Sequence, residues 1–212
     1  INIEDETSYP KPDIIEQGSV PMVTANYDET NDYDIDVALI FDEDKIPSSS
    51  LDCRKLIEKA LLKRASNFIK PPKARTNAVT IWYSEGYHID FAVHKKSTDQ
   101  FGIETFYHAG AEWTKRNPRS VTKWFKDNVS AKSPSGYFDS VEPEQMRKVV
   151  RLLKKYCKSR EKWSLPGGLV LSILVNECYV SDSDRDDVSL VKTIRAIKDR
   201  LDTSILVYNP TD

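Results

Sequence analysis

The amino-acid sequence predicts an α+β fold, in which a lobe built on a sheet precedes a helical lobe. Alternating apolar and polar residues, which are typical of strands, are concentrated before residue 95. Apolar residues at helical spacing dominate from Glu142 onward. We therefore expect one lobe over residues 1–135 and a second over residues 136–212.

The first strand is expected over residues 33–41, where every second side chain is apolar and shares one face. A helix should begin near Ser49, because Ser49 and Asp52 resemble a capping box and apolar residues follow at helical spacing. Pro71 should end this helix, since proline lacks the N–H that a helix interior needs.

Two further strands are expected over residues 78–83 and 87–93, joined around Gly86 as a hairpin. Residues 98–135 give a weaker pattern. Pro118 suits the first turn of a short helix in this segment, because backbone N–H groups in the first turn have no partner within the helix and proline lacks this group.

Three helices are expected in the second lobe. The first begins near Pro143 and carries an apolar stripe from Met146 to Cys157. The second begins at residues 164–166 and is apolar nearly all round, which favours burial. The third covers residues 184–201, with an acidic start and a basic end that suit the helix dipole.

Composition limits the class of protein. The chain has 212 residues, 39% hydrophobic and 30% charged, which is typical of a soluble globular protein. A net charge of −2 argues against coating nucleic acid, although a local basic patch remains compatible with it. Three cysteines without a CxxC pair indicate buried thiols in a reducing cytoplasm rather than a zinc site. No apolar run is long enough to span a membrane, and the start at Ile1 without Met suggests a piece of a longer protein.

Asp34 and Asp36 carry the strongest chemical signal. Two positions apart on a strand, their carboxylates point to one face and repel each other unless a cation lies between them. Mg²⁺ prefers carboxylate oxygens together with phosphate oxygens and waters. If the strand of Asp90 lies beside the first, a third carboxylate completes a two-metal site able to activate a hydroxyl and neutralise pyrophosphate.

A solvated acidic rim is the alternative for the aspartate pair, because many acidic residues surround it. Gly18 and Ser19 alone indicate an ordinary turn. In a site, however, glycine permits close backbone approach to a ligand, and a serine with free N–H groups at a helix start can hold phosphate. Together with Asp90, these residues favour a metal and phosphate site over the rim.

The Gly-Ser turn, the spacer, the Asp-x-Asp strand and the later strand aspartate resemble the signature of the DNA polymerase beta-like nucleotidyltransferase superfamily. Within it, the stretches QGSVPMVTANYDETNDYDIDVALIF and GYHIDFAVHK are similar to the bacterial CD-NTases, relatives of cyclic GMP–AMP synthase and oligoadenylate synthase in CBASS anti-phage systems. A basic helix followed by Leu165-Pro166 is similar too, so the resemblance covers nearly the whole chain.

The resemblance implies a two-lobed polymerase beta-like fold, with residues 1–135 as the nucleotidyltransferase catalytic lobe and residues 136–212 as a helical lobe truncated at its C-terminus. It implies a cytoplasmic enzyme that makes a cyclic di- or trinucleotide messenger from NTPs, ATP and/or GTP, for a separate effector protein in antiviral defence. The expected cofactors are two Mg²⁺ ions, with Mn²⁺ as a substitute. A nucleic-acid activator is left open, and no membrane partner is expected.

The resemblance also assigns residues to roles. The catalytic and metal-binding residues are Asp34, Asp36 and Asp90, and the nucleotide-binding residues are Gly18, Ser19, Lys154 and Gly167. The family often has serine where Gly167 stands, so a hydroxyl contact to phosphate is lost or replaced there. Two other functions use the same features: linear nucleotidyl transfer to RNA or a protein acceptor, and a catalytically silent nucleotide-binding module.

Basic and imidazole side chains leave alternatives open. Four basic residues share one helical face and either contact phosphate or form a solvated face: Arg147, Arg151, Lys154 and Lys158. His88 either lines the cleft or is an ordinary hydrogen-bonded strand residue, whereas His94 and His108 are expected at the surface.

Overall fold

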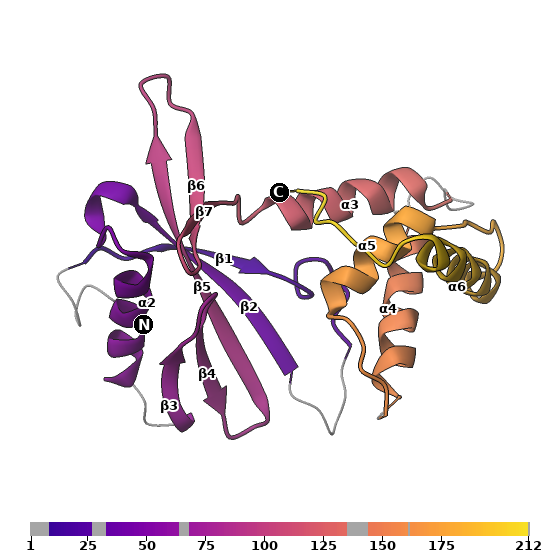
Figure 1. The fold of residues 1–212 in the computed structure, drawn as a ribbon, viewed down its shortest axis with the longest axis horizontal. Helices are drawn as coiled ribbons and strands as arrows, with labels where there is room; N and C mark the ends of the chain where they lie inside the picture. The colour runs from indigo at the N-terminus through magenta and orange to yellow at the C-terminus, as the bar shows by residue number, and fades with distance from the viewer. Residues whose placement is uncertain (1–8, 27–32, 64–67, 135–143, 161, 212) are drawn as a thin grey trace. The chain divides into compact units, whose positions relative to one another are not determined.

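The computed structural model describes residues 9–26, 33–63, 68–134, 144–160 and 162–211. It divides into two compact units, coloured along the chain in Figure 1. The sheet unit comprises residues 1–20 and 27–120, and the helical unit comprises residues 21–26 and 121–211. The units therefore divide at 120/121, whereas the predicted boundary at 135/136 lies outside the described residues.

A mixed sheet of seven strands forms the sheet unit, in the order β1-β2-β5-β4-β3, with β6 between β5 and β7. The strands are β1 (Asp13–Gln17), β2 (Tyr33–Asp42), β3 (Phe68–Ala74), β4 (Val79–Tyr83), β5 (Tyr87–Thr98), β6 (Glu104–Ala109) and β7 (Trp113–Lys115). Strands β2 and β5 run parallel, and the other pairs are antiparallel. With helices in the same chain, the predicted α+β class is confirmed.

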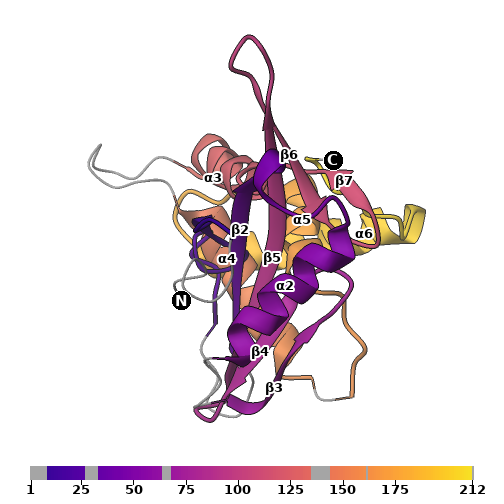
Figure 2. The same ribbon diagram turned by 90° about the vertical axis from the view of Figure 1, so that its left-hand side faces the viewer.

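Helix α2 (Ser50–Leu62) covers one face of this sheet, as Figure 2 shows. Its buried Cys53, Ile57 and Leu61 pack against apolar side chains of β2, β4 and β5. Burial of this kind stabilises the unit by about 25 cal/mol for each Å² of apolar surface removed from water. The predicted cap at Ser49 is confirmed, because its hydroxyl accepts a hydrogen bond from the Asp52 N–H at 3.3 Å.

The expectation that Pro71 ends the first helix was wrong. Helix α2 ends at Leu62, and Pro71 instead lies within β3. Strand β3 is at the edge of the sheet, where a proline costs no ladder hydrogen bond on its solvent side. The ladder between β3 and β4 also shifts register before the prolines, between Phe68 and Lys70, and again across them, between Lys70 and Lys73.

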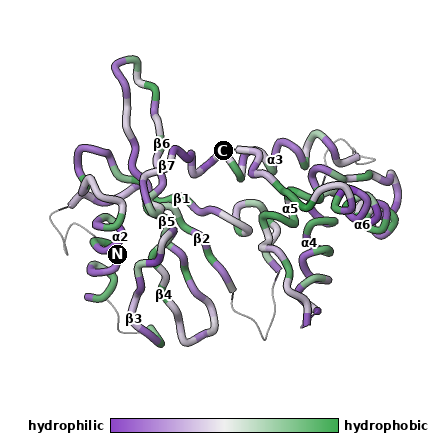
Figure 3. The backbone as a smooth tube through the Cα atoms, in the orientation of Figure 1, coloured by the Kyte–Doolittle hydropathy of each residue, from purple (hydrophilic) through white to green (hydrophobic). Residues whose placement is uncertain are grey.

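The helical unit contains α3 (Ser120–Lys132), α4 (Gln145–Lys158), α5 (Gly168–Cys178) and α6 (Asp186–Thr203). The apolar stripe predicted from Met146 to Cys157 is buried in its core, together with side chains of the other three helices. Helix α5 is hydrophobic along most of its length in Figure 3 and is buried from Leu171 to Asn176, as predicted. None of the described helices combines the length and apolarity needed to cross a bilayer.

Candidate active site

Parallel pairing of β2 with β5 brings the predicted aspartates together. In this register Asp34 lies beside His88, and Asp36 lies beside Asp90. Paired residues of neighbouring strands point to the same face, and so do residues two apart on one strand. The four side chains therefore share one face of the sheet. The alternate residues, such as Val37, belong to the apolar cluster under α2.

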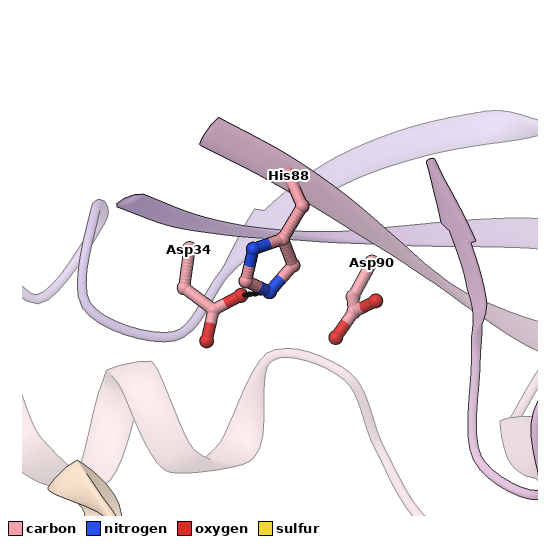
Figure 4. Close-up of side chains that lie close together, drawn as sticks. All are labelled: Asp34, His88 and Asp90. Carbon is pink, nitrogen blue, oxygen red and sulfur yellow. Dashed lines mark ion pairs between the residues drawn. The ribbon is translucent and has the colours of Figure 1, made fainter. Parts of the chain in front are cut away.

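Three of the four side chains meet at their polar ends, as Figure 4 shows. One ligand atom from each of Asp34, His88 and Asp90 lies within 4.8 Å of the others, and the His88 Nε2 directly contacts the Asp34 Oδ1. The Asp34 side chain is 61% exposed, so the group is open to an incoming ion and its ligand. Two carboxylates and an imidazole are a suitable donor set for a divalent metal ion.

Asp36 is directed to a neighbouring feature, the backbone of Gly18. Gln17, the last residue of β1, pairs with Asp36, and Gly18 follows with a φ of 67°. A Cβ added to Gly18 would overlap the Asp36 Oδ2 and lie 2.9 Å from its Cγ. Only glycine therefore leaves room for this carboxylate, which gives the Gly-Ser turn a structural role in the site.

Thr80 of β4 is a site residue that the sequence analysis missed. It lies directly opposite Asp90, is 1% exposed, and donates its hydroxyl proton in a hydrogen bond to the Asp90 carboxylate. This bond fixes the orientation of Asp90 and compensates for its place in mid-strand. Pairing the predicted strand ends, Tyr83 and Tyr87, and counting three residues outward would have placed Thr80 opposite Asp90.

Ser19 lies in a run of turns over residues 18–23 rather than at the start of a helix. It is half-buried, and Val23 in the same run has a positive φ of 55°. The backbone here departs from the helix start that phosphate binding by N–H groups would use. A phosphate contact by Ser19 would therefore rest on its hydroxyl and the local turn.

In the helical unit, Lys154 of α4 lies next to the start of α5. Its Nζ donates to the Thr24 carbonyl at 2.9 Å, and its Cε lies 3.1 Å from where a Gly168 Cβ would be. Gly167 is the N-cap of α5 and provides no side-chain capping bond. A lysine beside uncapped N–H groups at a helix N-terminus is a suitable place for a phosphate.

The remaining basic residues of α4 do not act as one face with Lys154. Arg147 pairs with Glu144, and Lys148 pairs with Asp186 at 3.0 Å. Arg151 and Lys158 are exposed. The solvated-face interpretation therefore fits Arg151 and Lys158, whereas the Arg147 side chain is only 14% exposed and Lys154 makes partly buried contacts.

His94 and His108 are not surface residues, contrary to expectation. They are 1% and 6% exposed and pair across β5 and β6, with ring centroids 5.1 Å apart. Burial, together with the nearby His108, lowers the pKa of His94 to about 4. Burial is also the main cause that lowers the pKa of His108. The prediction failed because β6, which contains His108 and pairs with the end of β5 that carries His94, has a weak sequence pattern.

Comparisons with known proteins show what this chain is similar to. Residues 12–94 match the model of the nucleotidyltransferase domain of the cyclic GMP-AMP synthase DncV-like family. A cyclic GMP-AMP synthase of Escherichia albertii is 22% identical over 192 residues, covering 86% of this chain and 40% of that protein.

Solved structures agree in fold. The cyclic AMP-GMP synthase DncV of Vibrio cholerae superposes with a TM-score of 0.71 at 17% identity, over 95% of this chain and 55% of that one. The CD-NTase CdnG of Bradyrhizobium diazoefficiens, solved with GTP, gives a TM-score of 0.65 at 16% identity, over 95% and 68%. This chain thus spans about half the length of DncV. The predicted resemblance to the bacterial CD-NTases is confirmed: residues 12–94 match the model of a DncV-like nucleotidyltransferase domain, and the chain shares the fold of DncV and CdnG.

Proposed function

We propose that this protein transfers a nucleotide from an NTP to a ribose hydroxyl and closes the product into a cyclic di- or trinucleotide. The observation that carries the proposal is the register of β2 and β5, which gathers Asp34, Asp36 and Asp90 on one sheet face within a domain of this family. A catalytically silent module would have no need of such costly neighbouring carboxylates.

The three aspartates would hold the divalent metal, which supplies charge neutralisation for the triphosphate and a lowered pKa for the attacking hydroxyl. Mg²⁺ is the proposed ion, with two ions per site and Mn²⁺ as a substitute. The protein's own contribution is orientation. Thr80 fixes Asp90, and Gly18 leaves room for Asp36.

Phosphate binding is proposed for Ser19 and Gly18 in the sheet unit, and for Lys154 and Gly167 in the helical unit. The support for Lys154 and Gly167 is that the lysine lies beside the uncapped start of α5. A lysine acts there as a point charge, and backbone N–H groups add direction. Since no serine hydroxyl stands at residue 167, these N–H groups would take over part of its role.

The nucleotide preference and the cyclic product rest on the relatives. DncV has been solved with the linear intermediate 5′ pppA(3′,5′)pG and with GTP, and CdnG has been solved with GTP. We propose ATP and GTP as substrates for this chain. We also propose a cytoplasmic role in CBASS anti-phage defence, with the product acting on a separate effector protein.

The test uses purified protein with radiolabelled ATP and GTP and either Mg²⁺ or Mn²⁺. Products are separated by thin-layer chromatography before and after phosphatase treatment, and their masses are measured. A cyclic product resists phosphatase because it has no terminal phosphate. Phosphatase-sensitive products that lengthen with time, or label that appears only with an added RNA or protein acceptor, would instead establish linear transfer. Nucleotide binding without turnover would establish a silent module.

A further inference from the structure

His88 is the member of the polar group that the aspartate signature does not account for. It is the cross-strand neighbour of Asp34 and lies two residues before Asp90 on β5. Its side chain is 18% exposed and directs its Nε2 at the Asp34 carboxylate, as Figure 4 shows. The imidazole therefore lies within the site, between two of its carboxylates, rather than beside it.

Coordination distances show what this placement allows. Ligand atoms at about 2.1 Å from a divalent ion are roughly 3 Å apart when adjacent and roughly 4 Å apart when opposite. The chosen atoms of Asp34, His88 and Asp90 lie within 4.8 Å of one another. These separations are close to the spacing that one ion requires, and the parallel register holds all three side chains on one face of the sheet.

We propose that His88 is a metal ligand, which gives this site a mixed nitrogen and oxygen donor set. Mn²⁺, the substitute ion in the function proposed above, would then bind here more tightly than Mg²⁺. The chemical reason is that imidazole suits transition-metal ions, whereas Mg²⁺ favours oxygen donors and keeps its waters. The proposal deepens the function above, because it rests on the same site binding a metal, and it names the residue that sets the relative affinity for the two ions.

A purely structural role for His88 makes a different prediction. In that role the imidazole only orients Asp34, and its loss would weaken Mg²⁺ and Mn²⁺ alike through the displaced carboxylate. If His88 is a ligand, its loss weakens the binding of Mn²⁺ selectively. In the wild-type protein, a histidine nitrogen is then bound to the metal. These two outcomes can be separated without any assay of activity.

The experiment is pulsed electron paramagnetic resonance of the Mn²⁺-loaded protein, with and without ¹⁵N-labelled histidine. A ligand role predicts nitrogen modulation that changes with the label and disappears in His88→Gln. The exposed Asp44→Asn serves as the matched control for adventitious ions on the acidic surface, and it should keep the signal. Wild-type protein without nitrogen modulation would overturn the proposal, whether or not the variant folds.

Calorimetric titration supplies the second measurement. His88→Gln should lose about tenfold or more in Mn²⁺ affinity and change Mg²⁺ affinity by less than about twofold. Equal losses for both ions would overturn the ligand role in favour of positioning. Failure of the proposed function is a separate result, namely no product with either metal. Absence of nitrogen modulation in wild-type protein that still forms product would refute only the role of His88.

Discussion

The backbone of Gly18 and the carboxylate of Asp36 occupy adjoining space, so that the glycine has no room for a side chain. The position of the turn after β1 therefore depends on strand β2, which carries Asp34 and Asp36, because a side chain at Gly18 would collide with Asp36. This contact explains in physical terms why a Gly-Ser turn and an Asp-x-Asp strand occur together in the sequence. Neither feature alone would have specified the arrangement.

Gly18→Ala should therefore displace Asp36 and lower nucleotidyl transfer severely. The new Cβ would overlap the Asp36 Oδ2, and the φ of 67° adds strain of its own. Gly86→Ala is the matched control, since Gly86 has a φ of 84° with nothing within 4 Å of a Cβ. The control should lose only about 1–2 kcal/mol of unfolding free energy, which is the cost of a left-handed backbone conformation for a residue with a Cβ. Equal thermal stability and activity in the two variants would contradict the coupling.

Each of Asp34→Asn, Asp36→Asn and Asp90→Asn should nearly abolish activity while the fold survives. Each removes a carboxylate rather than a packing group, and the loss should exceed the roughly 10- to 100-fold effect typical of an outer-shell partner. In metal-free buffer the melting temperature should rise slightly, because repulsion between neighbouring carboxylates is relieved. A variant with wild-type rates in Mg²⁺ would remove its residue from the site.

Much of the sheet could be predicted because its central strands have strong patterns. Residues of β2 and β5 alternate clearly, and the turn at Gly86 sets the hairpin register. Strands β6 and β7 could not be predicted. They are short, and β5 continues as far as Thr98 through polar and basic residues that carry no alternation.

The candidate site was predicted in part for a related reason. Periodicity places Asp34 and Asp36 on one face, but it says nothing about which strand lies beside them. The contact between His88 and Asp34 depends on the parallel pairing of β2 with β5, which is a property of tertiary structure. The roles of Gly18, Ser19, Lys154 and Gly167 in nucleotide binding remain predictions.

Thr80→Val should reduce the catalytic rate by about tenfold, while Thr80→Ser should restore it. Valine has the shape of threonine but cannot donate the hydrogen bond that holds Asp90, whereas serine keeps the hydroxyl. Steady-state rates at saturating NTP, with circular dichroism to verify folding, make the comparison. A serine variant as slow as the valine variant would show that packing of the Thr80 methyl group, not the hydrogen bond, matters.

Lys154→Ala should raise KM for NTP several-fold, with a smaller effect on kcat, because a phosphate contact already made in the ground state mainly sets KM. Lys158→Ala is the matched control, since Lys158 is an exposed lysine one turn further along the same helix. Steady-state kinetics of both variants test this prediction. Equal and negligible effects would show that α4 presents only a solvated basic face.

The buried pair of His94 and His108 should make the fold sensitive to acid. Burial lowers the pKa of His94 from 6.5 to about 4, so the unfolded chain binds a proton at a higher pH than the folded chain does. Stability is therefore fully present above the unfolded pKa of 6.5, and it is lost as the pH falls from there toward about 4. The shift corresponds to roughly 3 kcal/mol of unfolding free energy once both values have been crossed.

Urea denaturation over this pH range, in wild type and in His94→Gln, measures the effect. Glutamine has no proton to gain, so the variant should lose less unfolding free energy than wild type as the pH is lowered, even though it is less stable at neutral pH. Comparing slopes rather than absolute stabilities removes the packing cost of the substitution and the titration of carboxylates common to both proteins. His108 still titrates in the variant, so a residual slope is expected there. Parallel curves would mean that His94 gains its proton as readily in the folded protein as in the unfolded chain.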